Sequence, residues 1–351
     1  MGLKTLAGAA LIAALGAGAG AGPLRIATYS PDLSRDGPGL LLRDLTRTGK
    51  QADRQIAAAV QVIAETRPDI LLLTDLDWDY DGRALEALVA RLAEAGLDYP
   101  HRFAARPNSG MASGLDLNGD GRLNTADDAQ GFGEFPGQGG IAILSRHPIG
   151  PVTDYSAYLW RDLPGNLMPD LPEDVAAIRR LSSAAHWDAT VTVAGRPLHL
   201  LAMAATPPVF DGPEDLNGRR NHDELAFWLD RLPDAPFVLA GILNVDPADG
   251  DGRPQALARI MDHVTDPLPR SAGGAAARGG VNASHRGDPA LDTGDWSDDR
   301  PPGNLRADYV LPRKGLKILG SGVFWPAEGP LAEAALTASA HRLVWVDLDW
   351  P

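Results

Sequence analysis

The chain contains no cysteine among its 351 residues. Disulfide bonds, thiolate zinc sites and cysteine nucleophiles are therefore excluded. Basic residues are also sparse, because 32 lysines and arginines stand against 46 aspartates and glutamates, for a net charge of -14 at pH 7. Nucleic-acid binding depends mainly on basic side chains that neutralise phosphates, so the composition argues against a nucleic-acid partner.

The N-terminus has the pattern of a targeting segment. Lys4 precedes a small apolar stretch at residues 5–15, and two small-x-small cleavage patterns follow at residues 17–21. The apolar stretch is too short for a stop-transfer helix, and the order of the three parts is typical of a signal peptide. We predict a signal peptide at residues 1–21, with a flexible tail as the alternative. No second candidate membrane span follows, so residues 22–351 are expected to form one exported domain, periplasmic or extracellular.

The remaining sequence predicts a mixed α/β domain. Hydrophobic residues make up 44% of the chain, enough for a sizeable core. Apolar runs and alternation predict strands at 24–29, 69–76, 140–145, 197–205, 237–243, 306–311 and 343–348. Helical periodicity predicts helices at 51–66, 83–95, 221–232 and 254–262, while Gly, Asn, Asp and Ala dominate the loops at 108–139 and 270–303. This order of elements indicates two packed sheets flanked by helices.

One loop closely matches a calcium-binding pattern. Residues 116–127 read DLNGDGRLNTAD, with oxygen-bearing side chains at positions 1, 3, 5, 9 and 12 and glycine at position 6. The predicted ligands are Asp116, Asn118, Asp120, the carbonyl of Arg122, Asn124 through water, and Asp127. Asp128 could substitute for Asp127, and the alternative is a loop of Asx turns without an ion. Because no long helices flank the loop, we expect a structural Ca²⁺ and not a switch.

Several segments together resemble the endonuclease/exonuclease/phosphatase family, which includes DNase I-like nucleases and sugar- or inositol-phosphate phosphatases. They read RIATYS (25–30), RPDILLLTD (67–75), GIAILSR (140–146), AGILN (240–244), RADYVLP (306–312) and SAHRLVWVD (339–347). Residues 206–224, together with the calcium-type loop, look like an exported bacterial branch. The resemblance covers nearly the whole mature chain and implies a four-layer α/β/β/α sandwich with its active site at one end of the two sheets.

The resemblance also implies a site in which a carboxylate holds Mg²⁺ or Mn²⁺, a base prepares a water, and Asn and His donors stabilise the phosphoryl oxygens. At four positions this sequence departs from the family pattern. The replacements are Ser30 for a metal- and phosphate-binding Asn, Ala204 for a phosphate-binding His, Ile242 for the water-positioning Asp, and Ala340 for the Asp expected to orient His341. The residues that remain are Asn244, His341, Asp308 and, as a shortened metal ligand, Asp75.

The sequence therefore predicts an exported pseudo-hydrolase that acts as a binding module for a phosphorylated small molecule or a protein. The alternative is an active divalent-metal phosphoesterase with a rearranged site, using Asp75, Asn244, Asp308 and His341. Asp77 and Asp79 are either cation ligands or solvated loop charges, and Asp246 could stand in for the missing Asp. The replacements are compatible with natural loss of the site and with deliberate engineering, and the sequence specifies neither the ligand nor the oligomeric state.

Overall fold

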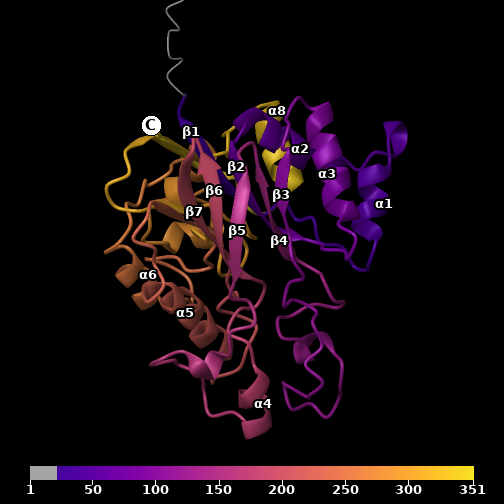
Figure 1. The fold of residues 1–351 in the computed structure, drawn as a ribbon, viewed down its shortest axis with the longest axis vertical. Helices are drawn as coiled ribbons and strands as arrows, with labels where there is room; N and C mark the ends of the chain where they lie inside the picture. The colour runs from indigo at the N-terminus through magenta and orange to yellow at the C-terminus, as the bar shows by residue number, and fades with distance from the viewer. Residues whose placement is uncertain (1–21) are drawn as a thin grey trace, which may run out of the picture.

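The computed structural model describes residues 22–351, so the predicted signal peptide at residues 1–21 lies outside the described residues. The described chain forms two mixed β-sheets packed face to face, with helices on their outer faces (Figure 1). This arrangement confirms the predicted four-layer sandwich.

The first sheet has six strands in the order β10-β11-β1-β2-β4-β3. Their bounds are Ile318–Val323, Val344–Leu348, Leu24–Tyr29, Ile70–Leu76, Gly140–Ser145 and His101–Phe103. The second sheet has five strands in the order β5-β6-β7-β8-β9. Their bounds are Ile149–Asp154, His186–Val193, Arg196–Ala204, Phe237–Ile242 and Asp308–Pro312.

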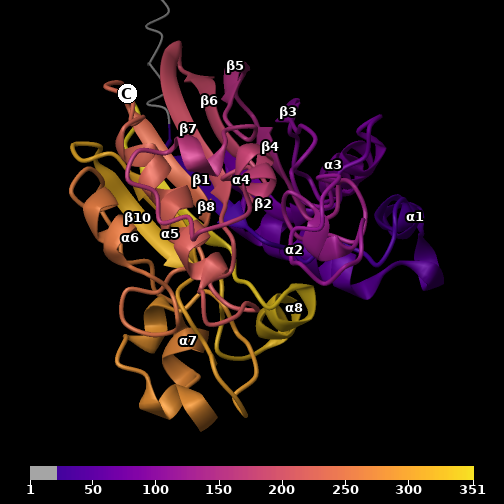
Figure 2. The ribbon, with the colours of Figure 1, turned by 90° about the horizontal axis from the view of Figure 1, so that it is seen from below.

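Three apolar layers hold the sandwich together. The central layer lies between the sheets and includes Ile26, Leu72, Ala240 and Val344, none of which is exposed. A second layer joins the six-stranded sheet to α1, α2 and α3, at Leu40–Thr46, Arg54–Thr66 and Arg83–Glu94. A third layer joins the five-stranded sheet to α5 and α6, at Leu216–Leu229 and Gln255–Ile260. Figure 2 shows these two helix groups on opposite sides of the sheets.

Both ends of helix α2 follow from its sequence. Asp53 precedes the helix, and its carboxylate accepts a hydrogen bond from the backbone N–H of Ile56 at 3.0 Å. Such a cap satisfies one of the N–H groups that a helix leaves unpaired at its start. The helix ends at Arg67, which adopts a left-handed conformation before Pro68.

The predicted core strands and the main helices are present with shifted bounds, and the structure adds elements that the sequence patterns did not indicate. The additions are β3, β5, β6, β10, α1, α4 (Glu173–Ile178), α7 (Ala272–Ala276) and α8 (Pro330–Ala338). Helix α5 begins at Leu216, five residues before its predicted start, and the predicted loop at 270–303 contains α7. Within residues 22–351, no helix has both the length and the apolar character needed to cross a membrane.

Candidate active site at the ends of the two sheets

Two carboxylates lie at one end of the six-stranded sheet. Asp75 lies at a register shift in β2, between Leu73 and Leu76, and has a φ of 52°. Asp32 follows the end of β1 and has a φ of 51°. Burial, followed by the negative charge of nearby Asp32, raises the pKa of Asp75 to about 6. The two carboxylates therefore form one electrostatically coupled pair.

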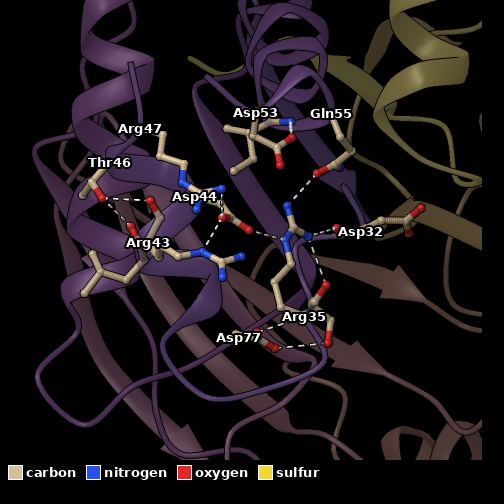
Figure 3. A network of polar contacts seen from close by, with 12 residues as sticks. Asp32, Arg35, Arg43, Asp44, Thr46, Arg47, Asp53, Gln55 and Asp77 are labelled. Carbon is tan, nitrogen blue, oxygen red and sulfur yellow. Dashed lines mark hydrogen bonds and ion pairs between the residues drawn. The ribbon is translucent and has the colours of Figure 1, made fainter. Parts of the chain in front are cut away.

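The loop that contains Asp32 is held by a polar network (Figure 3). Arg35 donates from Nη1 to the carbonyl of Asp32 at 2.9 Å and from Nη2 to Oε1 of Gln55, also at 2.9 Å. The carboxylate of Asp77 accepts from the backbone N–H of Arg35 and from the hydroxyl of Ser34. On its other side, Asp32 accepts a 3.0 Å hydrogen bond from the backbone N–H of Ala340. These contacts fix Asp32 beside Asp75, a neighbour that the sequence patterns did not predict.

His341 retains a carboxylate partner. Its Nδ1 atom lies 2.8 Å from Oδ2 of Asp308, which is fully buried and also accepts from the hydroxyl of Thr293 at 2.8 Å. The expectation that His341 lost its orienting Asp at Ala340 is therefore wrong, because Asp308 of β9 performs that role. Burial alone would lower the pKa of His341, but the adjacent charge and hydrogen bond of Asp308 raise it. The imidazole is thus oriented and stabilised in its protonated form.

The end of the five-stranded sheet is apolar at two of its key positions. Ala204 of β7 pairs with Ile242 of β8, and Ile242 pairs in turn with Asp308 of β9. Partners in register direct their side chains to the same face of a sheet. This row therefore presents two alkyl groups and one buried carboxylate. In the family pattern the position of Ala204 holds a His, and the position of Ile242 holds an Asp.

Asn244 follows that row, but its amide nitrogen is occupied. It donates to the carbonyl of Ala205 at 2.8 Å, and Asn244 has a φ of 51°.

Gly241, three residues before Asn244, allows strand β8 to approach β7 closely. Its φ is 140°, and a Cβ atom there would lie 1.8 Å from the carbonyl oxygen of Met203. The glycine of the motif is therefore required by close backbone approach, independently of any chemistry.

The three candidate replacement carboxylates have structural roles. Asp77 is buried and closes the network around Arg35. Asp79 accepts from the backbone N–H groups of Arg83 and Ala84 and so caps helix α3. Asp246 accepts three backbone N–H groups, those of Ala248, Asp249 and Arg306. These contacts do not support Asp77 and Asp79 as cation ligands, nor Asp246 as the stand-in for the missing Asp.

The donor set suits a weakly held Mg²⁺ or Mn²⁺. Mg²⁺ is commonly bound by one or two carboxylates, with water and substrate phosphate completing its shell. Asp32 and Asp75 would provide those carboxylates, and a cation beside them would offset the burial and the charge of Asp32 that together raise the pKa of Asp75. Within residues 22–351, no group of three or more acidic, His or Cys side chains has the arrangement of a metal site. Tight binding by the protein alone is therefore not expected.

The calcium-type loop has the turn geometry that its sequence predicts. The carboxylate of Asp116 accepts from the backbone N–H groups of Gly119, Asp120 and Gly121, at distances between 2.7 and 3.2 Å. Asp128 is buried and accepts from the N–H groups of Leu117 and Thr125, so it closes the loop. Asp127 is exposed. If the loop holds the predicted ion, Asp127 is the better twelfth-position ligand, because Asp128 is committed to closing the loop.

The remaining polar segments singled out in the sequence are part of the core. His186 is buried and its Nε2 lies 3.0 Å from the carbonyl oxygen of Glu224. Glu224 accepts from the backbone N–H groups of Ser183 and Thr206, and Arg220 donates to four carbonyls. Most of the tryptophans whose placement the sequence left open are also in the core: Trp160, Trp187, Trp228 and Trp325.

Comparison with known proteins agrees with this geometry. The sequence model of the endonuclease/exonuclease/phosphatase family matches residues 39–341. A crystal structure of an endonuclease/exonuclease/phosphatase from Beutenbergia cavernae aligns with a TM-score of 0.56 and 22% identity, over 93% of this chain and 71% of that one. A family protein from Leptotrichia buccalis aligns with a TM-score of 0.54 and 15% identity, over 93% of this chain and 100% of that one. No curated protein matches the chain. At these identities the structural similarity establishes the fold alone.

Proposed function

The chain belongs to the endonuclease/exonuclease/phosphatase family, and from this premise we propose that it is an exported, catalytically impaired member that binds a phosphorylated ligand. The observation behind this proposal is the row formed by Ala204, Ile242 and Asp308 across three paired strands. Two of its three side chains can neither exchange a proton nor donate a hydrogen bond. The site therefore keeps residues suited to binding and lacks groups needed for turnover.

The family residues that the site retains support ligand binding. A divalent cation held by Asp32 and Asp75 would supply positive charge to a phosphate oxygen. His341, protonated beside Asp308, would donate a charge-assisted hydrogen bond to the same ligand. A phosphomonoester or phosphodiester group matches this combination, since its oxygens accept both interactions.

The replacements at Ala204 and Ile242 account for the proposed loss of turnover. Loss of a positioned acid or base typically costs about 10²–10⁴-fold in rate. Loss of one donor to a developing negative charge typically costs about 10²–10³-fold. Because such groups act as a unit, the combined loss does not follow from adding the separate effects. With Ala204 and Ile242 in place, we expect a turnover number below about 10⁻² s⁻¹, against about 10 s⁻¹ for a typical enzyme.

A second candidate function is an active phosphoesterase with a rearranged site. The intact pair of His341 and Asp308, 2.8 Å apart, favours this alternative because an imidazole oriented by a carboxylate can act as an acid, a base or a charged donor. In that case Asp75 and Asn244 would have to replace the missing water-positioning group, although the amide nitrogen of Asn244 already donates to Ala205.

Hydrolysis assays distinguish the two functions. The mature protein is incubated with bis(p-nitrophenyl) phosphate or p-nitrophenyl phosphate in the presence of Mg²⁺, Mn²⁺ or Ca²⁺. Only slow turnover is expected. In the presence of Mn²⁺, calorimetry should detect binding of inorganic phosphate, and Asp75→Asn and His341→Gln should each weaken that binding. Rapid hydrolysis abolished by Asp75→Ala would establish the active enzyme instead, and absence of phosphate binding would contradict the binding module.

A restored site provides a second test. The double variant Ala204→His with Ile242→Asp returns an imidazole and a carboxylate to the row, so its rate should rise by about 100-fold. The matched control, Ala204→Gln with Ile242→Asn, has similar size and polarity but no acid or base. Equal rates for the two double variants would show that Ala204 and Ile242 are not the cause of low turnover.

Export and calcium binding complete the proposal. Residues 1–21 would be removed on export, which N-terminal sequencing of protein recovered outside the cytoplasm would test. A structural Ca²⁺ in the loop at 116–127 would suit such a location, because extracellular modules bind Ca²⁺ with dissociation constants as weak as about 10⁻⁴–10⁻³ M.

A further inference from the structure

A cavity of about 680 Å³ lies beside helix α6, which Figure 2 labels. Most of its wall is alkyl, and the apolar residues that form it are Pro247, Ala248, Pro254, Leu257, Ala258, Met261, Leu268 and Leu291. Leu268 is 53% exposed although it borders this cavity. A volume of this size accommodates a small organic molecule.

The polar part of the wall is predominantly acidic. It contains one guanidinium and four carboxylates, namely Arg306, Asp246, Asp266, Asp288 and Asp292. Arg306 is already paired with Asp266 through two hydrogen bonds of 2.7 Å, so these two charges offset each other. The remaining carboxylates favour a cationic ligand.

Two of those carboxylates are occupied within the fold. Both oxygens of Asp246 accept backbone N–H groups, including that of Arg306 at 2.8 Å. Asp288 pairs with Arg270 at 2.8 Å and caps the turn at Ala290. Their contacts are sufficient to explain why these acidic residues are present.

Asp292 is different. Its exposed fraction is 7%, no protein donor or ion-pair partner within residues 22–351 contacts its carboxylate, and the carboxylate oxygens keep some access to the cavity that Asp292 lines. Burial, together with the charges of Asp246, Asp249 and Asp288, raises the pKa of Asp292 to about 7. A buried carboxylate normally has partners, because leaving it unpaired costs free energy. The missing partner of Asp292 is therefore one that the protein itself does not supply.

A smaller cavity of about 280 Å³ reaches Asp292 from another side. Its wall includes Arg278, whose positive charge would oppose a cation there. The larger cavity is the better site for a cation because its only basic residue, Arg306, is neutralised by Asp266. A metal ion is a poorer match than an organic cation, since Asp292 alone would have to replace most of its water shell.

We propose that this cavity binds a small organic amine, with the ammonium group paired to Asp292 and the alkyl part packed against Leu257, Met261 and Leu268. None of the residues that line this cavity belongs to the row of Ala204, Ile242 and Asp308, so the proposal does not depend on the proposed phosphate binding.

Calorimetric titration of the mature protein with n-hexylamine tests this site at about pH 8, where Asp292 is ionised and an alkylamine is protonated. Binding is expected, and Asp292→Asn should weaken it at least about tenfold because a charge-assisted hydrogen bond is lost. Asp234→Asn, which changes an exposed carboxylate elsewhere, should bind as the wild type does. Neutral n-hexanol should bind wild type and Asp292→Asn alike.

Met261→Trp provides an independent check, because the larger ring would fill the cavity and leave Asp292 unchanged. This variant should lose binding of both n-hexylamine and n-hexanol. The proposal is overturned if the wild type releases no binding heat with n-hexylamine, if Asp292→Asn binds it equally well, or if Met261→Trp retains full affinity.

Discussion

The Nδ1 atom of His341 lies 2.8 Å from Oδ2 of Asp308, although 33 residues separate them in the chain. Strand β9 places Asp308 at the end of the five-stranded sheet, while His341 lies three residues before the start of β11 in the other sheet. The pair therefore joins the two sheets at the candidate site. The hydroxyl of Thr293 fixes the carboxylate by donating to the same oxygen at 2.8 Å.

The protonated state of His341 should contribute to stability over a definite pH range. Its pKa is raised above 6.5 in the folded protein, so the contribution is complete below about pH 6.5 and is lost as the pH rises through the folded pKa. Asp308→Asn removes the charge that raises this pKa and should destabilise the protein by about 1–3 kcal/mol. Urea unfolding between about pH 5.5 and 8 should show the largest loss at the acidic end.

Direct titration of the His341 imidazole by NMR gives the control for this prediction. The wild-type resonance should titrate above 6.5, and the Asp308→Asn resonance should titrate at lower pH. His147, whose pKa is lowered mainly by burial, should titrate in the variant as it does in the wild type. An unaltered His341 titration in Asp308→Asn would contradict the assigned role of Asp308.

Gly241→Ala should severely destabilise the fold. A Cβ atom at this position would lie 1.8 Å from the carbonyl oxygen of Met203, and the φ of 140° is unfavourable for any other residue. Because β7 and β8 pair through Met203 and Gly241, relief of the clash requires the central pairing of the sheet to open. We expect a loss of about 4 kcal/mol or more, measured by chemical unfolding. Gly195→Ala, in an open turn, should cost much less.

The calcium-type loop should show separate roles for its two adjacent aspartates. Asp128 closes the loop through the N–H groups of Leu117 and Thr125, so Asp128→Ala should lower the thermal midpoint with or without Ca²⁺. Asp127→Ala should leave the midpoint in chelator unchanged but remove the increase that Ca²⁺ produces in the wild type. Differential scanning calorimetry in Ca²⁺ and in chelator measures both effects. A wild-type midpoint that does not respond to Ca²⁺ would exclude the predicted ion.

Sequence patterns predicted most of the elements that are fully buried or strongly periodic, although the alternating strand β6 was missed. Strand β2 is apolar over Ile70–Leu73 and faces packed layers on both sides, so its sequence leaves little ambiguity. Strand β5, in contrast, is an exposed edge strand that contains Pro151. Its sequence has no alternation to recognise, and only pairing with β6 makes it a strand. Helix α8 is composed mainly of alanine and leucine, so no amphipathic pattern indicated it.

The candidate site was predictable at positions within family motifs and unpredictable at positions fixed by tertiary contacts. The spacing of the motifs located His341, Asp308 and Asn244. The partnership of His341 with Asp308 was not accessible in the same way, because it depends on how two sheets meet. Asp32 was missed because it lies in a loop whose left-handed residue and network with Arg35 exist only in the folded chain.

The unpaired carboxylate of Asp292 should make the protein less stable as the pH rises. Its pKa is raised from an ordinary value of 3.8 to about 7, so the folded state holds a proton that the unfolded state has already released. Stability is therefore lost between about pH 4 and pH 7, with the full penalty present above that range.

Asp292→Asn removes the penalty and should unfold at a temperature at least about 2 °C above the wild type at pH 8. At about pH 4 the two should unfold together, because the wild-type carboxyl is then protonated. Scanning calorimetry across this pH range measures the effect, with Asp234→Asn as the exposed control. If the difference in unfolding temperature between the wild type and Asp292→Asn did not grow with pH, the raised pKa of Asp292 would be contradicted.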